Sequence, residues 1–208
     1  PFNALKRLTL SAQTTMKIQW CSSSTSATAS IRNARLFAFK LPSEYAEDET
    51  RSTMASTSWQ TKVTLTFTPA TAGDYLIIAT ANLDGSSTFY DVKCRLLQDG
   101  TTEHANVIQR PSSSAARYNF GTMRKITLSA ASHNFTIQWC SSSAFGTAGI
   151  GYAHVIAIRV DQFPNNYYQE TEAESSPTAT ETWYNKVTST YTPQAGEHLF
   201  IGTRHQTA

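Results

Sequence analysis

Three cysteines and five histidines are the side chains of this sequence best suited to redox, metal or nucleophilic chemistry. Cys21 and Cys140 share the context Gln-Trp-Cys-Ser-Ser-Ser, so they occupy one position in two similar stretches. A complete stretch therefore carries Cys94 and Cys140 as a pair, which favours an intradomain disulfide in an oxidising compartment. Two buried free thiols are the alternative, because Cys94 belongs to an inward-facing set and Cys140 follows an inward tryptophan. The absence of a Cys-x-x-Cys spacing argues against a zinc site.

The histidines and carboxylates do not form a recognisable catalytic set. The histidines are dispersed at His104, His133, His154, His198 and His205. No Gly-x-Ser-x-Gly elbow occurs, and the sequence links no serine to a histidine and an aspartate. The carboxylates available for acid–base work occupy turns or outward strand positions: Asp74, Asp84, Asp91, Asp99 and Glu103. We therefore expect no enzyme activity, no catalytic residue, no metal and no cofactor.

Four tryptophans could stack on a ligand. Trp20 and Trp139 share a face with Ile18 and Ile137, which favours core packing. Trp59 and Trp183 each stand at the start of a strand beside a linker, where an inter-domain contact and a ligand contact are equally plausible. Asn134-Phe-Thr136 is a glycosylation sequon that matters only in a eukaryotic source.

These residues belong to a repeated sequence. Ile126 to Ser143 restates Leu8 to Ser24, and the Trp183-Tyr-Asn-Lys-Val-Thr segment restates Trp59-Gln-Thr-Lys-Val-Thr. A period of roughly 120 residues is the size of a domain, so the pattern predicts a tandem array. We expect a window cut from a longer repeat protein, with half-domains completed by neighbouring chains as the alternative.

The alignment of the copies predicts five segments. The first and last are partial sandwich repeats, residues 1–41 being a C-terminal part and residues 183–208 an N-terminal part. Residues 59–160 form the complete repeat. Residues 42–58 and 161–182 hold nine of the fifteen acids, lack hydrophobic periodicity, and are interpreted as solvated acidic linkers.

Alternation of apolar and polar residues predicts β-strands throughout the repeats. Lys62 to Thr68 places Val63, Leu65 and Phe67 on one face. Other inward sets are Ile126, Leu128 and Ala130; Phe135, Ile137 and Trp139; and Ile156, Ile158 and Val160. Turns are expected at Leu83-Asp-Gly-Ser, Gln98-Asp-Gly-Thr and Ala131-Ser-His-Asn. Eight to ten strands without helical periodicity favour one antiparallel β-sandwich per repeat.

Composition excludes several classes of protein. Charged residues make up 15% of the chain, and the net charge of +2 gives no basis for nucleic-acid binding. No apolar run is long enough to insert into a membrane.

One stretch carries a resemblance to a known family. Phe67-Thr-Pro-Ala-Thr-Ala-Gly-Asp-Tyr-Leu-Ile-Ile-Ala, with its echo beginning at Tyr191, resembles the strand–Pro–Gly–strand entry of C1q/TNF-like jelly rolls. The apolar strand Ala34 to Leu41 resembles the last strand of that architecture. The pattern is also similar to tandem β-repeats of long phage fibre and bacterial surface proteins. The resemblance implies an antiparallel jelly-roll-like sandwich.

These observations predict a structural protein, a subunit or segment of an extracellular or virion-surface fibre built from tandem domains. Other copies of the chain are the expected partners, through head-to-tail or lateral assembly. The alternative is an adhesin that binds a host-surface glycan or receptor, and its location would be extracellular, on a cell surface or on a virion.

Overall fold

The structure, a computed structural model, describes residues 43–113 and 116–161. Predictions that concern residues 1–41 and 162–208 lie outside this part of the chain. They include the two partial repeats, Trp20, Trp183, Cys21 and most of the second linker.

All regular structure in the described residues is β-strand, as the alternating patterns predicted. The nine strands are β1 (Ser43–Asp48), β2 (Ser52–Met54), β3 (Gln60–Phe67), β4 (Gly73–Gly85), β5 (Val92–Gln98), β6 (Thr102–Gln109), β7 (Arg117–Leu128), β8 (His133–Ser141) and β9 (Ala148–Arg159). No helix in the described residues has the length and apolar character needed to cross a membrane.

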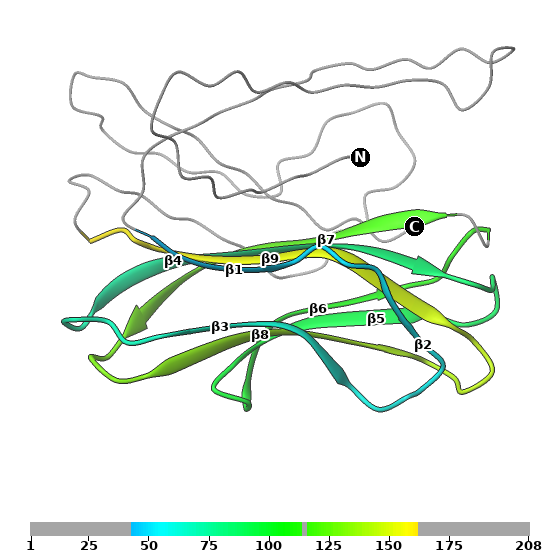
Figure 1. The fold of residues 1–208 in the computed structure, drawn as a ribbon, viewed down its shortest axis with the longest axis horizontal. Coiled ribbons are helices and arrows are strands. Elements are labelled where there is room, and N and C mark those ends of the chain that lie inside the picture. Colours follow the sequence, from blue (N-terminus) through cyan, green and yellow to red (C-terminus); the bar gives the residue numbers. More distant parts are fainter. Residues whose placement is uncertain (1–42, 114–115, 162–208) are drawn as a thin grey trace, which may run out of the picture.

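The strands form two antiparallel sheets packed face to face (Figure 1). One sheet has the order β1-β9-β4-β7, with β2 also paired to β9, and the other has the order β3-β8-β5-β6. From β3 onward the chain changes sheet at every connection except the β5–β6 hairpin. This strand order is that of a jelly roll, so the predicted fold class is confirmed for the described copy.

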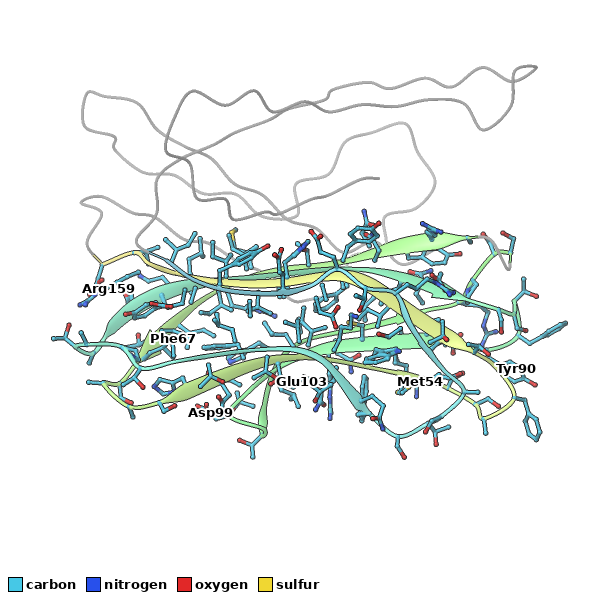
Figure 2. All side chains as sticks on the ribbon, in the orientation of Figure 1. Met54, Phe67, Tyr90, Asp99, Glu103 and Arg159 are labelled. Atoms are coloured by element: carbon cyan, nitrogen blue, oxygen red, sulfur yellow. The ribbon has the colours of Figure 1, made fainter. Side chains whose placement is uncertain are left out.

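The core lies between the sheets and follows the predicted alternation in most strands. In the pairing of β3 with β8, Val63 is opposite Ile137 and Leu65 is opposite Phe135. These four side chains and that of Phe67 are buried. Figure 2 shows Phe67 among the side chains that fill the space between the sheets. Inward β-branched and aromatic residues alternate with threonines on the outer face, which is the pattern a half-buried strand requires.

Residues 42–58 are not a linker throughout, and that prediction is wrong for two segments. Ser43–Asp48 pairs with β9 along its whole length, and Ser52–Met54 pairs with a later part of the same strand. The acidic composition concealed these strands, because β1 is an edge strand with charged side chains, a common protection against edge-to-edge association. The complete sandwich therefore begins at Ser43 rather than at residue 59.

The inward set predicted for the last strand is also wrong. Val155 and Ala157 belong to the core cluster, so Ile156 and Ile158 lie on the outer face of β9. This strand lies between β1 and β4 and is apolar on both faces. Its larger side chains lie on the outer face, so their size led to the wrong choice of inward face. Ala130 was also predicted to be inward, but it is exposed beyond the end of β7.

The turns were predicted with mixed success. The β5–β6 hairpin turns over three residues, Asp99 to Thr101, and Asp99 and Gly100 have φ values of 51° and 73°. Positive φ at both positions is typical of the Asp-Gly turn expected there. Leu83-Asp-Gly, in contrast, continues β4 to Gly85.

Candidate functional site

The outer face of the four-stranded sheet holds Trp59, one of the two predicted contact residues. The guanidinium carbon of Arg95 lies 4.2 Å from the centre of the Trp59 ring, in a cation–π arrangement. Arg95 is itself fixed, because its Nε and Nη2 donate to Gln138 Oε1 at 3.0 and 2.8 Å and its Nη1 lies 3.5 Å from Glu103 Oε2. One face of the indole is thus covered from within the domain. A ligand or inter-domain contact at Trp59 stays a prediction.

Cys94 and Cys140 lie on the neighbouring strands β5 and β8, and both are free thiols. Cys94 is opposite Trp139, whereas Cys140 is opposite Lys93. Successive residues of a strand point to opposite faces, so the two thiols lie on opposite sides of the sheet. The predicted disulfide is therefore not formed, and the alternative of two buried thiols describes the structure. Burial raises the pKa of both thiols, most strongly that of Cys94.

The carboxylates singled out in the sequence are paired with cations, not with one another. Asp84 Oδ1 lies 2.7 Å from Arg51 Nη2, and Asp91 Oδ1 lies 2.8 Å from Arg110 Nε. Asp74 forms a pair with Lys125 at 2.9 Å and accepts a hydrogen bond from the Thr127 hydroxyl at 2.6 Å. The hydrogen bonds from Thr127 and Lys125 hold the pKa of Asp74 below its usual range. Asp74 therefore lacks the raised pKa of a general acid.

A serine, a histidine and an aspartate that the sequence did not connect come together where the β5–β6 turn meets the β7–β8 connection. His133 Nδ1 lies 2.9 Å from Asp99 Oδ2, and His133 Nε2 lies 3.2 Å from Ser129 Oγ. Asp99 Oδ1 also accepts the backbone N–H of Asn134 at 2.7 Å. Burial disfavours the charged form of Asp99, but the hydrogen bonds from His133, Asn134 and Gln98 outweigh it and lower its pKa.

The order of these contacts is that of a hydrolytic triad, but the local geometry favours a structural link. Nε2 of His133 lies 3.3 Å from the carbonyl oxygen of Ser129 as well, so that carbonyl competes with the hydroxyl for the ring nitrogen. The imidazole and the carboxylate thereby join the β5–β6 turn to the β7–β8 turn. Sequence reasoning missed this link because only the fold brings the two turns together.

The loops at the other end of the sandwich expose aromatic side chains. Phe89, in the β4–β5 loop, is 80% exposed, and Phe145, in the β8–β9 loop, is 87% exposed. Tyr90, which Figure 2 places at this end, packs so closely on Gly146 that a Cβ there would lie 2.5 Å from the ring.

Hydrogen bonds hold these two loops together. Ser142 N–H donates to the Asp91 carbonyl at 2.8 Å, and Asp91 N–H donates to Ser142 Oγ at 2.8 Å. Further along, Ser86 N–H donates to the Thr147 carbonyl at 3.0 Å. The two exposed phenyl rings are therefore presented on ordered loops, which lowers the entropic cost of contacting a partner.

No protein family and no curated protein matches this chain. Among solved structures it is similar to dimeric latent PorU from Porphyromonas gingivalis, with 11% identity, a TM-score of 0.40, and coverage of 56% of this chain and 12% of that one. It is also similar to the Eiger TNF of S. frugiperda, with 9% identity, a TM-score of 0.38, and coverage of 65% and 99% of the two chains.

A third similar structure is a carbohydrate-binding module from Cellvibrio mixtus lichenase 5A in complex with cellotriose. It is 13% identical, with a TM-score of 0.29 and coverage of 53% of this chain and 94% of that one. Likenesses of this size do not bear on function, and the jelly-roll assignment rests on the strand order alone.

Proposed function

We propose that this chain is a structural segment of an extracellular or virion-surface fibre, built from jelly-roll domains joined in tandem. The observation that carries the proposal is the shortness of the joint between copies. Ala34 to Lys40 aligns with Ala153 to Arg159, so Lys40 occupies the position of the last residue of β9. β1 begins at Ser43, so only Leu41 and Pro42 would separate the first two domains of the sequence.

A joint this short favours a rod over a flexible chain of beads. Two residues, one of them proline with a fixed φ, allow little independent motion between neighbours. Glu44, Glu47 and Asp48, predicted to lie in a spacer, belong instead to the paired strand β1. Such an array would serve to build a long fibre by repeating one domain.

Sedimentation velocity and electron microscopy of the full chain over a range of concentrations would test the proposal. We expect elongated particles, because a joint of two residues leaves little independent motion between neighbouring domains. A compact monomer at every concentration would contradict the proposal.

A second candidate function, glycan or receptor binding by an adhesin, is favoured by the exposed Phe89 and Phe145. Ordered aromatic side chains at one end of a rigid sandwich are suited to stacking on a ligand. A glycan array probed with the wild type and with the Phe89→Ser and Phe145→Ser variants would test it. Binding that both substitutions abolish supports the adhesin, and binding that is unchanged argues against it.

A further inference from the structure

A histidine and two glutamates converge at the edge of the five-stranded sheet. Glu47 of β1 is paired directly with His154 of β9. Glu49 follows β1 and turns its carboxylate to the same imidazole. Nε2 of His154 lies 3.6 Å from Glu49 Oε1 and 3.8 Å from Glu47 Oε2, and the three ligand atoms all lie within 4.8 Å of one another.

We propose that Glu47, Glu49 and His154 bind one first-row divalent cation of the zinc type. Zinc accepts imidazole nitrogen and carboxylate oxygen at roughly 2.0–2.2 Å, which places two ligands of a tetrahedral ion about 3.3–3.5 Å apart. The separations from Nε2 to the two carboxylates exceed this by only a few tenths of an ångström. The two glutamate side chains are 32% and 44% exposed, and a shift of a few tenths of an ångström at their carboxylates would close that difference.

The surroundings of the cluster orient the histidine and one of the glutamates. The His154 side chain is only 4% exposed, and its ring stacks on Tyr45 with the planes 18° apart. Nδ1 lies 3.5 Å from the Thr80 hydroxyl, on the side of the ring away from the carboxylates. The Tyr45 hydroxyl donates to Glu47 Oε2 at 2.8 Å. Such outer contacts fix the orientation of ligands in metal sites.

The chemistry of the ligands selects the class of ion. One nitrogen donor and two carboxylates suit zinc and its first-row neighbours, whereas calcium takes six to eight oxygen ligands. Solvent at the exposed carboxylates can complete the coordination. Magnesium prefers an all-oxygen octahedron and keeps several of its waters, so it is also disfavoured.

The repeat supplies a natural comparison for the site. Tyr45-Ala-Glu47-Asp-Glu49 recurs in the sequence as Tyr168-Gln-Glu170-Thr-Glu172, outside the described residues. The acid pair is therefore a feature of the repeat. The histidine is not, because Ala34-Arg35-Leu36-Phe37 aligns with Ala153-His154-Val155-Ile156 and places arginine at its position. Arginine supplies positive charge but no ligand atom, so we expect one ion per chain.

Isothermal titration calorimetry of the metal-free full chain with zinc, calcium and magnesium chlorides would test the site. We expect one zinc ion per chain and no measurable heat from calcium or magnesium at the same concentrations. Glu47→Gln, Glu49→Gln and His154→Arg should each weaken zinc binding by 100-fold or more. Glu44→Gln removes the same charge from an exposed position of the same strand and should leave zinc binding unchanged.

The variants separate loss of the site from loss of the fold. Glu49→Gln changes an exposed side chain beyond the strand, so its circular dichroism spectrum should match that of the wild type. Thr80→Val should weaken zinc binding by about 10- to 100-fold through the orientation of His154. Zinc binding that is unaffected by Glu49→Gln and His154→Arg would show adventitious ions only and would overturn the proposal, as would the absence of zinc binding to the wild type.

Discussion

Lys62 is the residue whose replacement most sharply tests how the first two strands are held in place. Its side chain is only 1% exposed, and its Nζ lies 2.8 Å from Asp48 Oδ2 at the end of β1. Nζ also donates to the Thr50 carbonyl at 2.7 Å and to the Ser52 hydroxyl at 3.1 Å. One ammonium group from β3 therefore binds the end of β1, the following turn and the start of β2.

The substitution Lys62→Met keeps much of the aliphatic stem and removes the charge. Removing one partner of a fully buried ion pair costs about 3–5 kcal/mol. Asp48 keeps 34% of its side chain in solvent, which screens the charge that is left behind. We therefore expect a loss of about 2–3 kcal/mol in the free energy of unfolding.

A double-mutant cycle isolates the pair from the rest of the packing. Lys62→Met, Asp48→Asn and the double variant would be unfolded in urea and followed by tryptophan fluorescence. We expect the double variant to lose less than the sum of the single losses, with a coupling free energy of about 1–2 kcal/mol. Lys93→Met, on a half-buried position of β5, is the control and should stay within about 0.5 kcal/mol of the wild type.

The dependence of stability on pH gives a second test of the contact between Lys62 and Asp48. Burial disfavours the charged form of Asp48, yet its hydrogen bonds with Lys62 and Thr50 prevail and lower its pKa. The stability it contributes is therefore present above its unfolded pKa of about 3.9 and is lost as the pH falls through the lower folded value. Lys62→Met should reduce this acid-dependent loss. A variant as stable as the wild type, with additive effects in the cycle, would refute the reasoning.

Three further predictions concern the core, the linked turns and the thiols. Phe135→Ala should cost about 3–5 kcal/mol in urea unfolding, because the ring is fully buried, and Phe135→Leu should cost less. Asp99 has a lowered pKa in the folded state, so the stability it contributes is present above about pH 4 and is lost as the pH falls further. Asp99→Asn should therefore cost about 1 kcal/mol at neutral pH and flatten the acid-unfolding profile. An unchanged profile would count against the link between the turns. In a Cys21→Ser background, Cys94 and Cys140 should react with a thiol reagent only after unfolding, and fast reaction of the native protein would contradict their burial.

The sequence predicted the strands whose two faces differ in polarity. In β3 and β8 threonine, asparagine or glutamine alternates with a buried apolar residue, so the period alone identifies the inward face. In β9 both faces are apolar, and alternation carries no information about which of them meets the other sheet. The pairing of β9 with β1 and β4 decides that Val155, and not Ile156, points into the core between the sheets.

The side-chain clusters were beyond sequence reasoning for a different reason. Asp99 lies in the β5–β6 turn and His133 at the start of β8, and only the strand order β8-β5-β6 brings the two together. The contact between Glu47 and His154 likewise depends on a register between the first strand and the last. Neither register follows from local propensity, because a shift of one residue would leave the composition of each strand unchanged.

The position of β1 also changes the meaning of the repeat. Residues 42–58 and 161–182 differ in length, and this difference favoured a spacer, yet the first of them contains two strands and the counter-ion of a buried lysine. The lysine recurs in the sequence as Lys186, within Trp-Tyr-Asn-Lys-Val, whereas the position of Asp48 is taken by Thr171 in Tyr168-Gln-Glu170-Thr-Glu172. A buried ammonium requires a carboxylate or several acceptors close by, and in the described copy β1 and the turn after it supply them. The described copy therefore begins with its acidic strand, which belongs to the domain and not to a spacer before it.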